Sequence, residues 1–186
     1  NLSLTLAKLN LNTFDWANKE KAGEKVRNSI ELLSNSINTL SDISKSLNAE
    51  IIIQHGLLRA IDEEIERIRK VGLFKVKYEV KGEPIFMEGQ SELILFRIIQ
   101  EAFNNIIRHA RAHHASLVLD YNPEKLTLVI LDDGNGFDQN TLNGTDHAGL
   151  KNMESRISML NGKMILQSAP GKGTILYFTI PLEKHA

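Results

Sequence analysis

Three polar side chains stand four residues apart in a segment that is otherwise strongly apolar. They are Glu101, Asn105 and His109, with Arg108 beside the last of them. Four residues advance an α-helix by about 40° beyond a full turn, so on a helix these side chains lie along one edge. A carboxylate and an amide oxygen one turn apart can hold a hard cation and its water, as Mg²⁺ is held next to phosphate oxygens. The polar edge of an ordinary amphipathic helix has the same spacing, and the spacing alone leaves both interpretations open.

A second candidate group directly follows an expected strand. It reads Asp132-Asp133-Gly134-Asn135-Gly136-Phe137. A buried carboxylate at Asp132 can accept a hydrogen bond from an exocyclic amine such as that of adenine, and glycines without side chains let the backbone approach a flat ring. A purely structural glycine-rich turn is the alternative.

A third group consists of two more glycine-containing segments. Gly149-Leu150 begins an expected helix, and the unpaired N–H groups at a helix start suit phosphate. Gly171-Lys172-Gly173-Thr174 leads into the last expected strand. Each segment alone is a weak signal, so the three groups have to be judged together.

Two familiar phosphate-binding loops are excluded. A Walker loop needs Ser or Thr after Gly-Lys, but Met164 and Gly173 follow the two Gly-Lys pairs of this chain. A dinucleotide-binding fingerprint that began at Gly134 would need glycine at position 139, which is Gln139.

The elements that must position these residues follow from hydrophobic periodicity and turn signals. Apolar residues at helical spacing predict helices, and alternating residues between turn signals predict strands. Asp132 to Ala148 is polar and without periodicity, which is typical of a functional loop or of a disordered segment. We expect an α/β sandwich, with helices on one face of a mixed, mainly antiparallel sheet of about five strands. The expected elements are a helix at Leu57–Val71, a strand at Leu73–Val80, a helix at 91–110, strands at Ala115–Tyr121 and Lys125–Leu131, a helix at Gly149–Leu160, and strands at Lys163–Ser168 and Thr174–Ile180.

The first part of the chain has a different pattern. Apolar residues recur at steps of four and three, and they are Val26, Ile30, Leu33, Ile37, Leu40, Ile43 and Leu47. Such a narrow seam is typical of helices that pack against partner helices. Leu2, Leu6 and Leu9 form a shorter stripe, so residues 1 to about 47 are expected to hold the end of one helix, a turn and a long second helix. A hairpin packed on its own domain and a dimerising bundle both fit.

Composition narrows the function classes. The 186 residues are 42% hydrophobic and 24% charged, which indicates a globular protein. The net charge of −1 excludes the basic field that captures nucleic acid, and the absence of cysteine excludes disulfides and thiolate metal sites. No apolar stretch approaches the ~20 residues that cross a bilayer. We expect a cytoplasmic location for this chain, which is compatible with anchoring of the whole protein in an inner membrane.

Taken in order, the candidate groups resemble a known family. The blocks are Glu101-x-x-x-Asn105-x-x-Arg108-His109-Ala110, Asp132-x-Gly134-x-Gly136-Phe137, Gly149-Leu150-Lys151-Asn152-Met153-Glu154-Ser155-Arg156-Ile157 and Gly171-x-Gly173-Thr174. This series resembles the ATP-binding domain of bacterial sensor histidine kinases, whose fold is shared with gyrase, the ninety-kilodalton heat-shock chaperone and mismatch-repair ATPases. The first block and the short lid resemble nitrate sensors and membrane-fluidity thermosensors in particular.

The resemblance implies ATP and Mg²⁺ as cofactors and a role for each site residue. Asp132 is the adenine contact, with Thr174 supporting it through a hydroxyl or water, and Asn105 is the magnesium ligand. Glu101 has the catalytic position, which orients a water in the hydrolysing relatives. The remaining implied ATP-binding residues shape the pocket and its lid or approach the phosphates, and they are Arg108, His109, Gly134, Gly136, Gly149, Leu150 and Lys151.

The resemblance also implies an activity and partners. A sensor histidine kinase transfers the γ-phosphoryl group of Mg-ATP to a histidine and from there to an aspartate of a response regulator. Residues 1–50 would be a partial dimerisation hairpin through which two copies associate, and residues 51–186 the ATP-binding catalytic domain, without nucleic-acid or direct membrane contact. The alternatives are a degenerate nucleotide-binding scaffold and an anti-sigma-type serine kinase of the same fold, although the latter lacks the hairpin.

Two features depart from the pattern of the family. The lid normally closes with Gly-x-Gly-Leu, whereas this chain has His147-Ala148-Gly149-Leu150. The acceptor block His-Asp-x-x-Gly-Gln is expected just before Asn1, because the first residues resemble the segment that comes directly after this block in the family. We therefore expect that this chain binds ATP without phosphorylating itself.

Overall fold

The computed structural model describes residues 2–13, 19–139 and 148–182. Within this part, the chain forms two compact units, Asn1–Glu50 and Ile51–Ala186. Helix α1 (Leu2–Asn12) lies in the first unit, and helix α2 (Lys19–Val71) contributes residues to both. None of the described helices is long and apolar enough to cross a membrane.

The first unit holds α1 against the start of α2. The buried Ser29 hydroxyl donates to the carbonyl oxygen of Lys25 at 2.7 Å and lies 3.4 Å from that of Ala7, and the Lys25 ammonium donates to the carbonyl oxygen of Thr13 at 2.7 Å. Apolar side chains nevertheless remain exposed on both helices: Leu4, Leu6, Leu9, Leu11, Ile30 and Leu33. The later seam residues Ile37, Leu40, Ile43 and Leu47 lie outside the part whose side chains are described.

Helix α2 contains the expected helix at Leu57–Val71 as a separate segment after a break in the helical backbone. It continues past residue 47 to Val71, with non-helical backbone at Gly56 (φ 80°, ψ 170°), a conformation that glycine adopts without a steric penalty. The helix restarts at Leu57, whose N–H donates to the buried Glu92 carboxylate of α3 (Gly89–Asn105) at 2.9 Å. This bond satisfies an N–H group that a helix start leaves unpaired.

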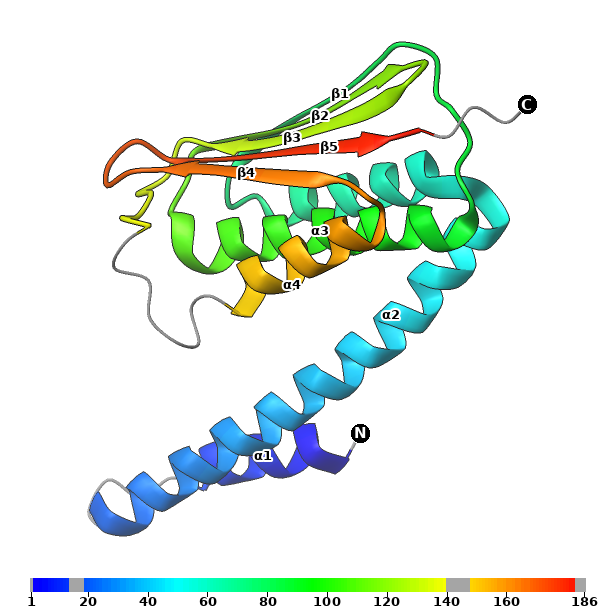
Figure 1. Cartoon of the computed structure of the whole chain (residues 1–186). Helices are drawn as coiled ribbons and strands as arrows, with labels where there is room; N and C mark the ends of the chain where they lie inside the picture. The colour runs from blue at the N-terminus through cyan, green and yellow to red at the C-terminus, as the bar shows by residue number, and fades with distance from the viewer. Residues whose placement is uncertain (1, 14–18, 140–147, 183–186) are drawn as a thin grey trace. The chain divides into compact units, whose positions relative to one another are not determined.

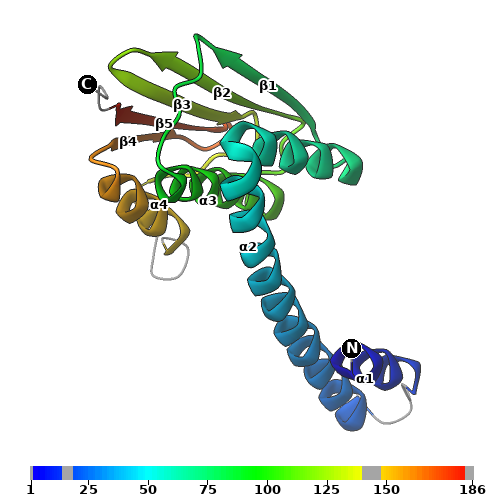
Figure 2. The ribbon, with the colours of Figure 1, turned by 90° about the vertical axis from the view of Figure 1, so that its right-hand side faces the viewer.

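The second unit is a five-stranded sheet with helices on one face (Figures 1 and 2). The strands are β1 (Lys75–Lys81), β2 (His114–Asn122), β3 (Lys125–Asp132), β4 (Lys163–Ser168) and β5 (Thr174–Pro181). Their order is β1-β2-β3-β5-β4, with β1 parallel to β2 and the other pairs antiparallel. Between β1 and β2 runs α3 (Gly89–Asn105), a crossover that a parallel pair requires. The predicted sandwich with a mixed, mainly antiparallel sheet is confirmed.

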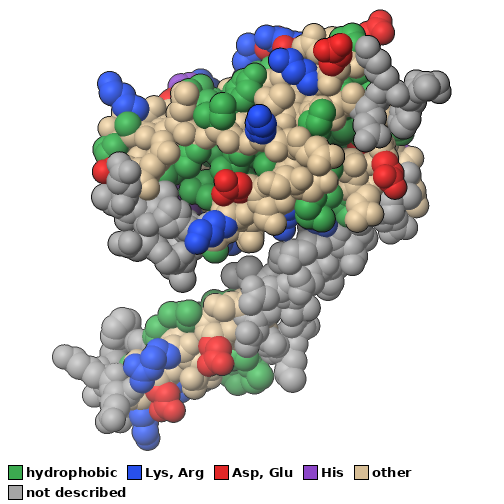
Figure 3. Space-filling view, in the orientation of Figure 1, with side chains coloured by type: hydrophobic (Ala, Val, Ile, Leu, Met, Phe, Trp, Pro, Cys, Tyr) green, Lys and Arg blue, Asp and Glu red, His purple; other side chains and the backbone are tan. Residues whose placement is uncertain are grey.

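Alternation along the strands places the core between sheet and helices. In β2 and β3 every second side chain is buried, including Leu117, Leu119, Leu128 and Ile130. Residues 57–71, α3 and α4 (Ala148–Met159) cover these side chains with their own apolar faces. On the face of this unit that Figure 3 shows, acidic and basic side chains are interspersed.

The helix expected at 91–110 does not keep one geometry to its end. It is α-helical to Asn105 and continues as a π-helical turn, η1 (Ile106–Ala110), before Arg111 adopts a left-handed backbone (φ 51°). The expected 40° stagger of Glu101, Asn105 and His109 is therefore wrong beyond Asn105, because a π-turn has more residues per turn than an α-helix. Such turns are frequent at functional sites.

Candidate functional site

A pocket opens between the end of α3 with η1, the end of β3, the start of β5, and α4. Its volume is about 300 Å³. Most of the lining is apolar, and four polar side chains converge on it, a combination typical of small-molecule sites. The lining residues are Ala102, Asn105, Ile106, His109, Ala110, Ile130, Asp132, Gly136, Phe137, Leu150, Thr174 and Leu176.

Asp132 is the buried carboxyl group of this pocket. It ends β3, is 6% exposed, and pairs in register with Thr174 of β5. Its Oδ1 accepts the Gly134 N–H at 2.9 Å. Burial raises the pKa of Asp132, and the backbone N–H groups of Gly134 and Thr174 counteract that rise. A carboxylate has about four acceptor positions, so these two bonds leave capacity for a ligand donor.

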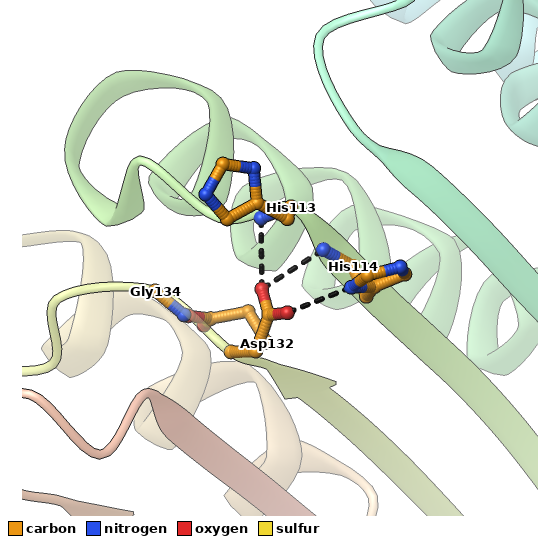
Figure 4. Close-up of polar contacts among 5 residues, drawn as sticks. His113, His114, Asp132 and Gly134 are labelled. Carbon is orange, nitrogen blue, oxygen red and sulfur yellow. Dashed lines mark hydrogen bonds and ion pairs between the residues drawn. The ribbon is translucent and has the colours of Figure 1, made fainter.

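The neighbouring carboxylate has a different environment. Asp133 Oδ1 accepts the backbone N–H groups of His113 and His114, each at 2.8 Å, and its Oδ2 lies 2.8 Å from His114 Nδ1 (Figure 4). These bonds lower the pKa of Asp133 to about 2. Asp133 therefore ties the end of β3 to the start of β2, and it does not line the pocket.

Glycines let the loops around Asp132 approach backbone closely. A Cβ on Gly134 would lie 2.2 Å from the Ala110 carbonyl oxygen, which accepts the Asn135 N–H at 2.7 Å. A Cβ on Gly173 would lie 2.0 Å from the Asp132 carbonyl oxygen. The loop after β3 is thus fastened to the end of η1 on one side and to the loop before β5 on the other.

Ser168 is a site residue that the sequence interpretation missed. It ends β4 opposite Thr174, and its hydroxyl contacts the Phe137 N–H, the Gly173 carbonyl oxygen and the Thr174 hydroxyl, each at 3.0 Å. The sequence feature that could have indicated Ser168 is its place at a strand end, opposite Thr174 in a hairpin, where paired hydroxyl groups commonly form a hydrogen bond. That signal depends on the register of the strands.

The other end of the pocket is formed by α3 and the start of α4. A Cβ on Gly149 would lie 2.5 Å from Glu101 Oε1 and 3.5 Å from both terminal atoms of the Asn105 amide, so the start of α4 lies next to these two side chains. Glu101 and Gly149 thus stand directly behind Asn105, whereas Leu150 lines the pocket itself.

Of the three basic side chains predicted to approach the phosphates, only one lines the pocket. His109 is exposed and lines the pocket. Arg108 and Lys151 are exposed and do not line it. His147, the departure in the lid motif, lies outside the described residues.

The oxygen donors near Asn105 suit a magnesium ion. An amide and a carboxylate, from Asn105 and Glu101, are hard oxygen ligands. Among the described residues no group of three or more His, Cys, Asp or Glu side chains could hold a metal. Mg²⁺ does not require one, because it usually keeps several waters and is shared with substrate phosphates.

The fold of this chain is similar to that of solved histidine kinase structures. A blue-light-activated histidine kinase of Erythrobacter litoralis matches with a TM-score of 0.64 and 19% identity, over 81% of this chain and 51% of that one. The histidine kinase domain of the same protein covers 97% of this chain, with a TM-score of 0.60. At these identities the matches show the fold alone.

Sequence comparison identifies closer relatives. The histidine-protein kinase/phosphatase DegS of Brevibacillus brevis is 30% identical over 165 residues, which are 88% of this chain and 42% of DegS. The sensor histidine kinase LiaS of Bacillus subtilis is 28% identical over 127 residues, or 68% of this chain and 34% of LiaS. The chain therefore spans less than half the length of these curated relatives.

A family model decides the assignment. The model of the histidine kinase-, DNA gyrase B- and HSP90-like ATPases matches residues 90–184, which contain all four sequence blocks. Together with the sensor histidine kinases among the relatives, this match confirms the predicted resemblance. The narrower grouping with nitrate sensors and thermosensors stays a prediction. The chain belongs to the histidine kinase-, DNA gyrase B- and HSP90-like ATPase family.

Proposed function

We propose that the unit Ile51–Ala186 binds Mg-ATP in the pocket described above, as the catalytic domain of a cytoplasmic two-component sensor histidine kinase. The observation that carries the proposal is the arrangement of this pocket. Asp132 and Thr174 stand at one end, and Asn105 with Glu101 behind it at the other. An adenine ring fits the first end and phosphates with a hard cation fit the second, inside a segment that belongs to an ATPase family.

At the adenine end, the Asp132 carboxylate accepts a hydrogen bond from the exocyclic amine. Backbone bonds already hold the carboxylate in place, so no reorientation is needed when the ligand arrives. Apolar side chains such as Ile130, Phe137 and Leu176 line the same pocket and suit the faces of the ring. Gly134 and Gly136 keep the surrounding loop free of side chains that would obstruct the approach.

At the phosphate end, Asn105 would ligate Mg²⁺ through its amide oxygen. The cation neutralises phosphate charge and fixes the γ-phosphate for transfer. His109 at the pocket lining, and Arg108, Lys151 and the Gly149-Leu150 segment nearby, are proposed to approach the phosphates.

The proposed reaction is phosphoryl transfer to a histidine. An imidazole nitrogen forms a bond to the γ-phosphorus while the bond from that phosphorus to the bridging oxygen breaks, and ADP leaves. Glu101 is assigned the catalytic role as the carboxylate beside Asn105 at the phosphate end, and the proton of the other imidazole nitrogen is free to leave to water. Positioning and charge stabilisation supply most of the catalysis in such reactions.

Partners follow from the same proposal. A response regulator would receive the phosphoryl group on an aspartate. Two copies would associate through residues 1–50, the proposed partial dimerisation hairpin. This association is supported by the exposed apolar side chains on α1 and the start of α2, because a second copy would bury apolar surface that is otherwise in contact with water.

The function is tested with γ-labelled ATP and the whole protein. A histidine kinase gains label that is lost in acid and kept in base. A degenerate scaffold binds ATP without labelling, and an anti-sigma-type serine kinase produces acid-stable label on its substrate. Acid-stable label, or ATP binding without any transfer, would therefore replace the proposed activity with one of these alternatives.

Replacing Asn105 with Ala should weaken the Mg²⁺ dependence of ATP binding more than it weakens adenosine binding. Only the phosphate end of the ligand requires the cation. Calorimetric titration of ATP with and without Mg²⁺, and of adenosine, measures the difference. Asn104→Ala is the matched control, since Asn104 is exposed and does not line the pocket. Equal losses for both ligands would mean that Asn105 is structural.

A further inference from the structure

Three side chains form one row across the end of the sheet at the pocket. Asp132 of β3 pairs in register with Thr174 of β5, and Thr174 pairs in register with Ser168 of β4. Asp132 and Thr174 line the pocket, whereas Ser168 does not. Ser168 therefore lies one strand behind the pocket, in contact with it through Thr174.

The hydrogen atoms around Ser168 can be assigned from valence. The Gly173 carbonyl oxygen has no hydrogen, so its 3.0 Å contact with the Ser168 hydroxyl requires that Ser168 donates. A hydroxyl has one hydrogen, and that donation uses it. The Phe137 N–H, at 3.0 Å, then points at one of the two lone-pair positions of Ser168 Oγ.

The Thr174 hydroxyl is assigned by the same reasoning. Its oxygen lies 3.0 Å from Ser168 Oγ, and either atom could donate by distance alone. Because the hydrogen of Ser168 is already directed at Gly173, Thr174 must be the donor. The hydrogen of Thr174 is therefore turned away from the pocket, and its oxygen is left with lone pairs, as an acceptor.

We propose that Ser168 is a specificity-determining positioning residue, which holds the Thr174 hydroxyl as an acceptor so that the pocket prefers adenine to guanine. This inference rests on the proposed ATP-binding function. With the Thr174 hydroxyl fixed, the row presents two acceptors to the base, the Asp132 carboxylate and the Thr174 oxygen. For this selectivity, Thr174 contacts the base directly.

The chemistry of the two purines makes this arrangement selective. At the equivalent ring position adenine has an amine, which donates, and guanine has a carbonyl, which accepts. Two fixed acceptors suit the amine and leave the carbonyl of guanine without a donor. Without Ser168, the Thr174 hydroxyl can rotate and donate to that carbonyl, so guanine would be rejected less strongly.

The experiment measures Kd for ATP and for GTP, each with Mg²⁺, in the wild type and in Ser168→Ala. The selectivity, Kd for GTP divided by Kd for ATP, should fall roughly 3- to 10-fold in the variant, the range expected from one misdirected hydrogen bond. Ser168→Thr keeps the hydroxyl and should retain the selectivity. Ser158→Ala is the control, since the exposed Ser158 hydroxyl bonds only within its own helix, to the Glu154 carbonyl oxygen at 2.9 Å.

A double-mutant cycle separates positioning from general support of the fold. Thr174→Val alone should lower the selectivity, and adding Ser168→Ala to it should lower the selectivity no further, because Ser168 acts through Thr174. Thr174→Val also tests the inference if Ser168→Ala does not fold. The inference would be overturned if Thr174→Val kept the full selectivity of the wild type. It would also be overturned if Ser168→Ala lost affinity for both nucleotides while its selectivity stayed unchanged.

If the proposed ATP-binding function is wrong, the measurements differ from those expected when only the role of Ser168 is wrong. A wild-type protein that binds neither nucleotide, or binds both without regard to Asp132, contradicts ATP binding in this pocket. A wild type that prefers ATP through Asp132, combined with a Ser168→Ala variant of equal preference, contradicts only the role of Ser168.

Discussion

Replacing Asp132 with Asn should lower the affinity for ATP by roughly 5- to 150-fold, the effect of about 1–3 kcal/mol for a mispaired buried polar group. Both Gly134 and Thr174 direct backbone N–H groups at this side chain. The Asn amide has only one oxygen to accept from these two N–H groups and from the ligand amine. Its NH₂ group would therefore face one of these donors, and two donors cannot form a hydrogen bond. Calorimetry with ATP and Mg²⁺ measures the loss.

The adjacent carboxylate provides a matched control. In Asp133→Asn, the amide oxygen can still accept the N–H groups of His113 and His114, and the NH₂ group can donate to His114 Nδ1. This variant should keep its fold and its affinity for ATP, because Asp133 does not line the pocket. If a folded Asp132→Asn protein bound ATP as tightly as Asp133→Asn, the assignment of Asp132 to the adenine would be wrong.

Much of the fold and of the pocket could be predicted because local patterns determine them. Alternating apolar residues placed all five strands, and the turn residues between them placed their ends. The order of the four blocks placed Asp132, Asn105 and Thr174 together, and Gly149 marks where α4 must approach Glu101. In each case the signal lies within a few residues of the element that it describes.

The features that were missed depend on contacts between distant segments. The π-helical turn at Ile106–Ala110 has an ordinary helical pattern, so periodicity alone cannot separate it from α3. The bonds of Ser168 require the register of β4 and β5 and a loop that precedes them by thirty residues. The Glu92 carboxylate accepts a hydrogen bond from the N–H group of Leu57, which lies 35 positions away in the sequence. Sequence reasoning predicted several residues that line the pocket, but not the contacts that hold them in place.

Replacing Gly173 with Ala should destabilise the second unit by about 2–5 kcal/mol and weaken ATP binding in the protein that remains folded. Its backbone has φ 71°, where a side chain costs about 1–2 kcal/mol. The new Cβ would also lie 2.0 Å from the Asp132 carbonyl oxygen, so the end of β3 must move, at a further cost of about 1–3 kcal/mol. Asp132 would move with it.

Gly171→Ala isolates the backbone cost from the steric one. Gly171 has φ 73°, almost the same as Gly173, but nothing lies within 4 Å of a Cβ built there. Its N–H can still donate to the Asn135 carbonyl oxygen in the Ala variant. This change should therefore cost only the backbone term of about 1–2 kcal/mol and leave the affinity for ATP unchanged. Denaturant unfolding and nucleotide titration of both variants measure the difference, and equal destabilisation would show that β3 yields to the methyl group without cost. If Gly173→Ala were less stable than Gly171→Ala but bound ATP equally well, the close packing of Gly173 would support the fold without positioning the Asp132 carboxylate.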